Sequence, residues 1–126
     1  MAEHIATGQL GEDLAASYLK GEGFKILARN VANPFGKRLG ELDIVAEQKK
    51  EIVFVEVKTL RERPDGEEWL PEWNATPRKF VKLERIAAYY LKKEGLSERS
   101  YRFDVVAVTL REGKEPSIKH IEYAFY

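Results

Sequence analysis

The stretch from Gly40 to Thr59, GELDIVAEQKKEIVFVEVKT, contains two apolar runs that are separated by a short polar segment at 47–50. Runs of β-branched residues on either side of a polar turn are typical of two adjacent strands. In the second run, EIVFVEVK, successive side chains point to opposite faces, and both faces are apolar in its first half. Such a strand has to be covered on both faces, so we predict that it is central in a sheet.

Helices are predicted on both sides of this hairpin in the chain. From about Thr7 to Lys20, Leu14, Ala15 and Leu19 fall on one arc at about 100° per residue, which indicates the core-facing stripe of a helix. A second helix is predicted over 77–94, where threonine and proline precede an apolar stripe and glycine follows it.

The remaining strands are predicted at 24–30, 101–110 and 118–126, with the last one at an edge of the sheet. A helix connects the third strand to the fourth, so these two are predicted to be parallel neighbours. The fold class is therefore α/β, a single domain over residues 1–126 with the order α-β-β-β-α-β-β and a mixed β-sheet flanked by helices.

Composition limits the classes of protein to which the chain can belong. Lysine plus arginine and aspartate plus glutamate number 21 each, so a surface for nucleic acid would have to be local. The longest apolar run, IAAYYL, is far too short for a membrane span, and the chain lacks the pattern of a secretory signal. Cysteine is absent, which excludes disulfides. We expect a cytoplasmic protein with no membrane partner. His4 and His120 have no companion ligands nearby in sequence, which argues against a zinc site.

The tripeptide Glu-x-Lys occurs three times in the chain, but only Glu56 and Lys58 stand at the end of an apolar central strand. The other two copies lie in polar, turn-rich segments, where charged side chains are readily solvated. Burying an unpaired charge costs on the order of 2 to 5 kcal/mol. We therefore expect Glu56 and Lys58 to have partners or to bind a metal ion.

Asp43, on the preceding strand, lies on the face of Glu56 if the turn holds an even number of residues. A turn of four residues would place Glu41 opposite Glu56 and Asp43 opposite Phe54. A turn of two residues would place Asp43 opposite Glu56. An odd turn would point Asp43 away from Glu56 and weaken the case for a shared site.

Two carboxylates beside a lysine form a hard-oxygen site suited to Mg²⁺ or Mn²⁺, and phosphodiester hydrolysis is the chemistry that such a site serves. Glu12 is the charged residue in the apolar arc of the first helix and is a candidate third metal ligand, whereas Lys79 in the second helix is placed to reach a phosphate. In the alternative interpretation, Glu56 and Lys58 are an ordinary ion pair at a strand end. Glu12 then interacts with the helix dipole, and Lys79 extends past the core to solvent.

Five segments carry a wider resemblance: GQLGEDLAASYLKGEGFKIL, GELDIVA, IVFVEVKT, TPRKFVKLERIAAYYL and RFDVVAV. Together they resemble the YraN-like family of small bacterial proteins, which is similar to the Holliday-junction resolvases of the PD-(D/E)XK nuclease superfamily. The resemblance implies a restriction-endonuclease-like fold, with Asp43, Glu56 and Lys58 matching the superfamily signature and Glu12 matching its acidic residue in the first helix. Leu42 stands where the signature has proline.

Glu41 and Lys79 match positions typical of the YraN-like sequences. The function implied is a Mg²⁺- or Mn²⁺-dependent endonuclease that hydrolyses DNA, including branched or recombination intermediates, and a homodimer would suit a two-fold substrate. Basic residues are expected to contact the DNA: Lys37, Arg38, Arg61, Arg78 and Lys79, with Arg29, Arg63 and Lys82 on the same rim.

Two other functions remain open at this stage. One is a non-catalytic nucleic-acid-binding or adaptor protein on the same fold. The other is a protein-interaction module that uses Trp69 and Trp73 in the charged loop 60–75. These tryptophans could instead stack on unpaired bases or pin the loop to the core.

Overall fold

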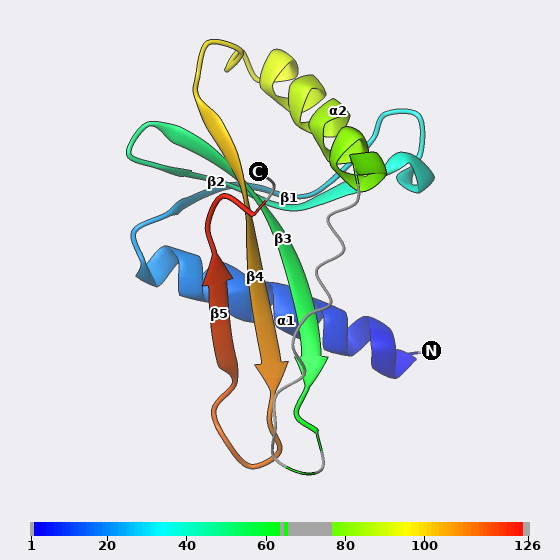
Figure 1. Cartoon of the computed structure of the whole chain (residues 1–126), viewed down its shortest axis with the longest axis vertical. Coiled ribbons are helices and arrows are strands. Elements are labelled where there is room, and N and C mark those ends of the chain that lie inside the picture. Colours follow the sequence, from blue (N-terminus) through cyan, green and yellow to red (C-terminus); the bar gives the residue numbers. More distant parts are fainter. Residues whose placement is uncertain (1, 64, 66–76, 125–126) are drawn as a thin grey trace.

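The computed structural model describes residues 2–63, 65 and 77–124 (Figure 1). Its elements, in chain order, are α1 (Ala2–Gly21), β1 (Lys25–Ala32), the short 3-10 helix η1 (Lys37–Leu39), β2 (Glu41–Gln48), β3 (Glu51–Arg61), α2 (Pro77–Lys93), β4 (Tyr101–Leu110) and β5 (Ser117–Ile121). The strands form one sheet in the order β1-β2-β3-β4-β5, in which β3 and β4 are parallel and the other neighbours are antiparallel. The predicted α/β fold, a mixed sheet flanked by helices and consistent with the restriction-endonuclease-like type, is confirmed.

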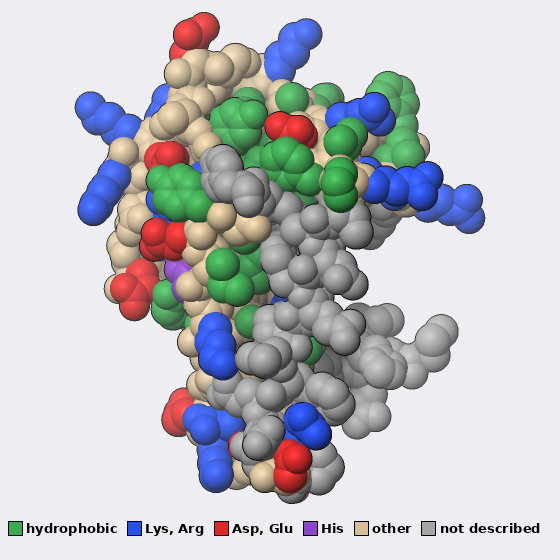
Figure 2. All heavy atoms as spheres, viewed as in Figure 1, with side chains coloured by type: hydrophobic (Ala, Val, Ile, Leu, Met, Phe, Trp, Pro, Cys, Tyr) green, Lys and Arg blue, Asp and Glu red, His purple; other side chains and the backbone are tan. Residues whose placement is uncertain are grey.

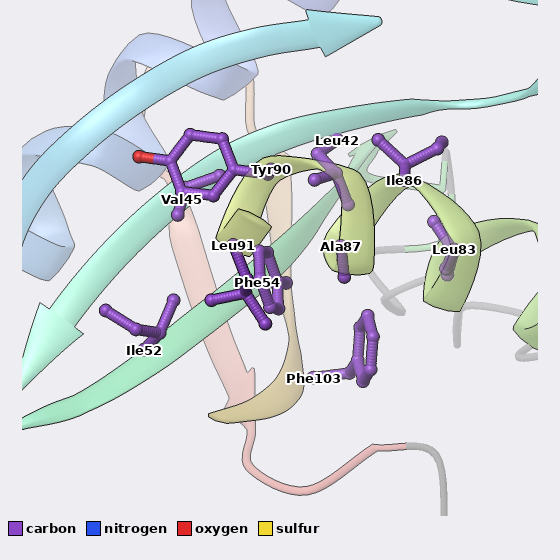
Figure 3. Close-up of a cluster of buried hydrophobic side chains, with 10 residues drawn as sticks. All are labelled: Leu42, Val45, Ile52, Phe54, Leu83, Ile86, Ala87, Tyr90, Leu91 and Phe103. Atoms are coloured by element: carbon purple, nitrogen blue, oxygen red, sulfur yellow. The ribbon is translucent and has the colours of Figure 1, made fainter. Parts of the chain in front are cut away.

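A helix covers each face of the sheet. On one face, Ala15 and Leu19 of α1 pack with Ile44 and Val53 of the central strands. On the other face, Phe54 packs against α2 in the cluster that Figure 3 shows. Side chains that alternate along β3 therefore enter two separate cores, which is why the first half of this strand is apolar on both faces.

The β2–β3 turn consists of Lys49 and Lys50, whose φ angles of 50° and 68° are both positive. Positive φ at both central residues defines the type I′ turn, whose twist matches paired antiparallel strands. The ladder runs from this turn to the pair Ile44 and Val55, and the residue numbers of every pair add up to 99. The turn therefore holds an even number of residues, which is the condition for Asp43 and Glu56 to share one face of the sheet.

The helix and strand boundaries differ most from the predicted ones in two places. α1 begins at Ala2, before the predicted start near Thr7. The prediction started too late because the first residues lack the apolar stripe from which the helix was inferred. β5 ends at Ile121, earlier than predicted, and Tyr123 turns the chain with a φ of 53°. The loop tryptophans, Trp69 and Trp73, lie outside the described residues. In the described part of the chain, neither helix combines the length and apolarity that a membrane crossing needs.

A buried polar cluster joins β4 to β5 and to the turn that follows. Asp104 is 0% exposed and accepts hydrogen bonds from Arg102 Nε at 3.0 Å and from the backbone N–H of Tyr123 at 3.1 Å. His120 Nε2 lies 2.8 Å from the same carboxylate. Burial alone would raise the pKa of Asp104, but the hydrogen bonds from His120 and Arg102 hold this pKa below its ordinary value. The negative charge of Asp104 is thus stabilised by structural partners.

Candidate active site

β2 separates from β3 at the end of the sheet where Asp43 and Glu56 lie. The last pair of the β2–β3 ladder is Ile44 with Val55. Beyond it, Leu42 remains paired with Val31 of β1. The backbone N–H of Val57 donates instead to Asp43 Oδ2 at 2.8 Å, so a side chain receives the hydrogen bond where the ladder has stopped. This split leaves a hollow between the two strands.

The hollow contains both carboxylates that the sequence analysis had placed together. Extending the ladder's register by one residue sets Asp43 opposite Glu56. Both residues line the hollow, along with Glu41 and with Leu83 of α2. Of the two even turns considered, the two-residue one is present, and the strand-end carboxylates face a common space.

Glu56 has a different environment at each of its two oxygens. Lys79 Nζ lies 2.8 Å from Glu56 Oε1, and Lys58 Nζ lies 3.1 Å from the same atom. Glu56 Oε2 is buried and has no hydrogen-bond partner within the described part of the chain. A buried carboxylate oxygen without a partner is costly, so this atom is available for an additional ligand.

Asp43 carries an unusually high pKa for an aspartate. Burial raises the pKa of this carboxyl from 3.8 to about 6, and the neighbouring charges of Glu12, Glu56 and Glu41 contribute to the rise, while the Val57 N–H opposes it. Three other carboxylates therefore lie close enough to repel the charge of Asp43. A divalent cation placed among them would relieve this repulsion.

Lys58 remains an ammonium group in this environment. Burial alone would lower its pKa, but the charge of Glu56 and the hydrogen bond to it raise the pKa above its ordinary value. The site thus presents fixed positive charge next to the two carboxylates, and Lys79 adds a second ammonium group at Glu56.

Glu12 reaches this region because α1 approaches β3 very closely at the preceding residue. A Cβ atom added to Gly11 would overlap the side chain of Thr59 on β3, so only glycine fits at this position without displacement. Glu12 Oε1 then lies 3.9 Å from Arg29 Nη2. Burial raises the pKa of Glu12, Arg29 lowers it, and Glu41 raises it further.

Asn30 links the two outer carboxylates of this group. With its amide oriented so that the nitrogen donates, it reaches Glu41 Oε1 at 3.0 Å and Glu12 Oε1 at 3.1 Å. Its φ of 55° places it in the left-handed region, which asparagine tolerates better than most residues. Sequence reasoning did not identify Asn30 or Gly11. The glycine inside an otherwise helical pattern was the available signal for a close approach.

The predicted DNA-contacting residues occupy different surroundings. Lys79 lies inside the site as a partner of Glu56. Arg38, Arg61 and Arg78 have exposed side chains, and the side chain of Lys37 lies outside what the structure describes. Arg29 pairs with Asp13 and Glu12 on the β1 side of the site. Their contact with DNA stays a prediction.

The donor set fits a hard divalent cation with few protein ligands. Within the described residues, no three carboxylate or histidine side chains gather into a complete ligand set. Mg²⁺ does not require one, because it usually keeps several waters and binds one or two carboxylates together with substrate phosphates. Asp43 and the unpartnered Glu56 oxygen would supply two such ligands, whereas Glu12 is directed toward Arg29 and Asn30.

Comparison with known proteins identifies the family. Residues 11–108 match the profile of the family described as "Uncharacterised protein family UPF0102". A UPF0102 protein of Moorella thermoacetica is 46% identical over 119 residues, covering 94% of this chain and 93% of the relative. Another, of Syntrophomonas wolfei, is 46% identical over 118 residues, covering 94% and 96%. A third, of Trichlorobacter lovleyi, is 46% identical over 121 residues, covering 95% and 90%. The YraN-like resemblance is therefore confirmed, and the chain belongs to the UPF0102 family.

Proposed function

We propose that this chain is a divalent-metal-dependent endonuclease that hydrolyses phosphodiester bonds in DNA, with branched or recombination intermediates among its substrates. The observation that carries the proposal is the shared hollow of Asp43 and Glu56 at the strand split, with Lys58 and Lys79 at Glu56 Oε1. Carboxylates that bind a metal ion, beside an ammonium group that contacts phosphate, are a combination that promotes phosphodiester hydrolysis.

Asp43 and Glu56 would hold the ion. When bound, Mg²⁺ or Mn²⁺ polarises the scissile phosphate and lowers the pKa of a bound water. Lys58 Nζ stays protonated and can donate a hydrogen bond to a phosphate oxygen or to the attacking water. The hydrogen bond from Val57 N–H fixes the Asp43 carboxylate at the strand split, so its position does not depend on the substrate.

Lys79 has a second role in this proposal. In the described structure it neutralises Glu56 Oε1 together with Lys58, and both are partly exposed. When a phosphate approaches the mouth of the hollow, the Lys79 ammonium group can turn from Glu56 to the phosphate, leaving the carboxylate for the ion. A homodimer would present two such hollows to a two-fold substrate.

A non-catalytic nucleic-acid-binding protein is the second candidate, and one observation favours it. Glu56 Oε1 is bonded to two ammonium groups in this structure, which neutralises a carboxylate that a nuclease uses for its ion. The same geometry in a binding protein would serve only to hold phosphate.

Cleavage assays separate the two candidates. The chain contains an internal control, because Glu112 and Lys114 repeat the Glu-x-Lys tripeptide in an exposed segment away from the hollow. Wild type, Lys58→Ala and Lys114→Ala are incubated with end-labelled four-way, flapped and linear DNA in Mg²⁺, Mn²⁺ or EDTA. We expect metal-dependent cleavage that falls by about 100-fold or more in Lys58→Ala and is unchanged in Lys114→Ala. DNA binding without cleavage by the wild type would favour the non-catalytic protein, and cleavage that survives Lys58→Ala would contradict the assigned site.

A further inference from the structure

The outer face of α2 carries a row of cationic side chains in a chain with no net charge. At about 100° per residue, Arg78, Lys82, Arg85, Lys92 and Lys93 fall within about 60° of one line along the helix. All five side chains are exposed. We call these five residues the α2 stripe. The helix contains one acidic residue, Glu84, which lies about 120° away from the centre of this line.

The charges of the α2 stripe have no ionic partners among the residues that the structure describes. None of the five residues forms an ion pair within the part of the chain that the structure describes. Like charges at spacings of three and four, as in Arg78, Lys82 and Arg85, destabilise an isolated helix. The sequence keeps them together although acidic residues are as common as basic ones in the whole chain. A polyanion that docks on this face would compensate their repulsion.

Aromatic side chains near the α2 stripe indicate which polyanion it is. Tyr89 lies on the same face and is 40% exposed, and Phe35, in the β1–β2 turn, is 88% exposed. This turn approaches α2 at Gly40, where an added Cβ would lie 3.9 Å from Lys82 Cβ. Figure 2 shows lysine and arginine side chains projecting at the upper right, where α2 and this turn lie. Aromatic rings among cations suit a nucleic acid, because the rings can stack on unpaired bases at a branch point while the cations contact phosphates.

We propose that the α2 stripe binds the phosphate backbone of one DNA arm and leads it to the Asp43–Glu56 hollow. Arg78 begins the stripe directly beside Lys79, whose ammonium group lies 2.8 Å from Glu56 Oε1. From Arg78 to Lys93 the helix rises by about 22 Å, comparable to the spacing across about six or seven base pairs. The inference rests on the proposed function for the identity of the substrate, and it assigns the surface that holds the substrate outside the hollow.

The binding test uses the full chain in EDTA, so that binding is measured without cleavage. Fluorescence anisotropy with a labelled four-way junction compares wild type with Arg78→Gln/Lys82→Gln/Arg85→Gln. A control, Lys20→Gln/Lys25→Gln/Lys114→Gln, removes the same charge at exposed positions outside the stripe. Thermal unfolding verifies that each variant is folded.

We expect the stripe variant to bind at least about 10-fold more weakly near 0.1 M salt, with a slope of log K against log salt that is reduced by up to about 2.7. The control variant should bind within about 3-fold of wild type. Shortening the arms below about six base pairs should weaken binding by the wild type, because a shorter arm no longer reaches Lys92 and Lys93 at the far end of the stripe. Equal losses in both variants, or no DNA binding by the wild type, would overturn the inference. Stripe-dependent binding of poly-glutamate or phosphatidylserine vesicles that is tighter than that of DNA would overturn it too.

The two proposals can fail separately. Stripe-dependent binding by a wild type that does not cleave would remove the nuclease proposal and leave this one. Metal-dependent cleavage with binding that is unaffected in the stripe variant would remove this inference and leave the nuclease.

Discussion

At the scale of single residues, the centre of the account is a carboxyl group that folding places in an unfavourable position. Asp43 is largely buried, lies near Glu12, Glu41 and Glu56, and has a pKa raised to about 6. Without a cation, its ionised form costs free energy in the folded protein. A functional site that opposes stability in this way is common in enzymes.

Asp43→Asn should therefore stabilise the metal-free protein at alkaline pH. Because the pKa rises from 3.8 to about 6 on folding, the folded chain binds more protons than the unfolded chain between these values. Stability then falls as pH rises through this window, by about 2 to 3 kcal/mol in total for this group. The asparagine oxygen can still accept the Val57 N–H bond.

Urea unfolding in EDTA at pH 4.5 and pH 8 measures the effect. We expect Asp43→Asn to exceed wild type by about 1 to 2 kcal/mol at pH 8 and to lose part of the pH dependence between the two conditions. Glu112→Gln, at an exposed position, serves as the control. A variant less stable than wild type at pH 8, with the pH dependence intact, would show that Asp43 is not repelled as described.

At the scale of elements, the site depends on how closely α1 is seated on β3. Gly11 allows the helix to contact Thr59, and this contact brings the next residue, Glu12, to the other carboxylates. The opposite side of the site is set by α2, which delivers Lys79 to Glu56. The two helices thus place charged side chains at one strand split from opposite faces of the sheet.

Two glycines of α1 should respond to alanine in opposite directions. Gly11→Ala forces a methyl group into the side chain of Thr59, and we expect it to lower the free energy of unfolding by about 1 to 3 kcal/mol. A Cβ atom added at Gly8 has no atom of another residue within 4 Å, and alanine favours the helix more than glycine does. Gly8→Ala should therefore raise the free energy of unfolding by up to about 1 kcal/mol. Denaturant unfolding of both variants tests the seating of α1. Equal stabilisation by both substitutions would contradict the close approach.

At the scale of the whole molecule, apolar alternation and helical periodicity were sufficient to predict the element order, because each strand and helix displays its core-facing residues in the sequence. The helix that connects the third strand to the fourth then predicted the parallel β3–β4 pair. The β2–β3 register could not be predicted in the same way, because Lys49 and Lys50 adopt positive φ without the Asn-Gly or Asp-Gly signal that marks a type I′ turn. Lys79 was predicted to reach a phosphate, whereas its partner in the structure is Glu56. Such partners depend on packing between distant elements, which periodicity does not reveal.

The central claim of the proposed function is that Asp43 and Glu56 are ligands of one divalent ion. Calorimetric titration of Mn²⁺ at pH 8, where the Asp43 carboxyl is ionised, tests it in wild type, Glu56→Gln and Glu112→Gln. We expect stoichiometric binding by wild type and Glu112→Gln, and at least about 10-fold weaker binding by Glu56→Gln. Equal affinity in all three proteins, or no measurable binding by the wild type, would contradict it.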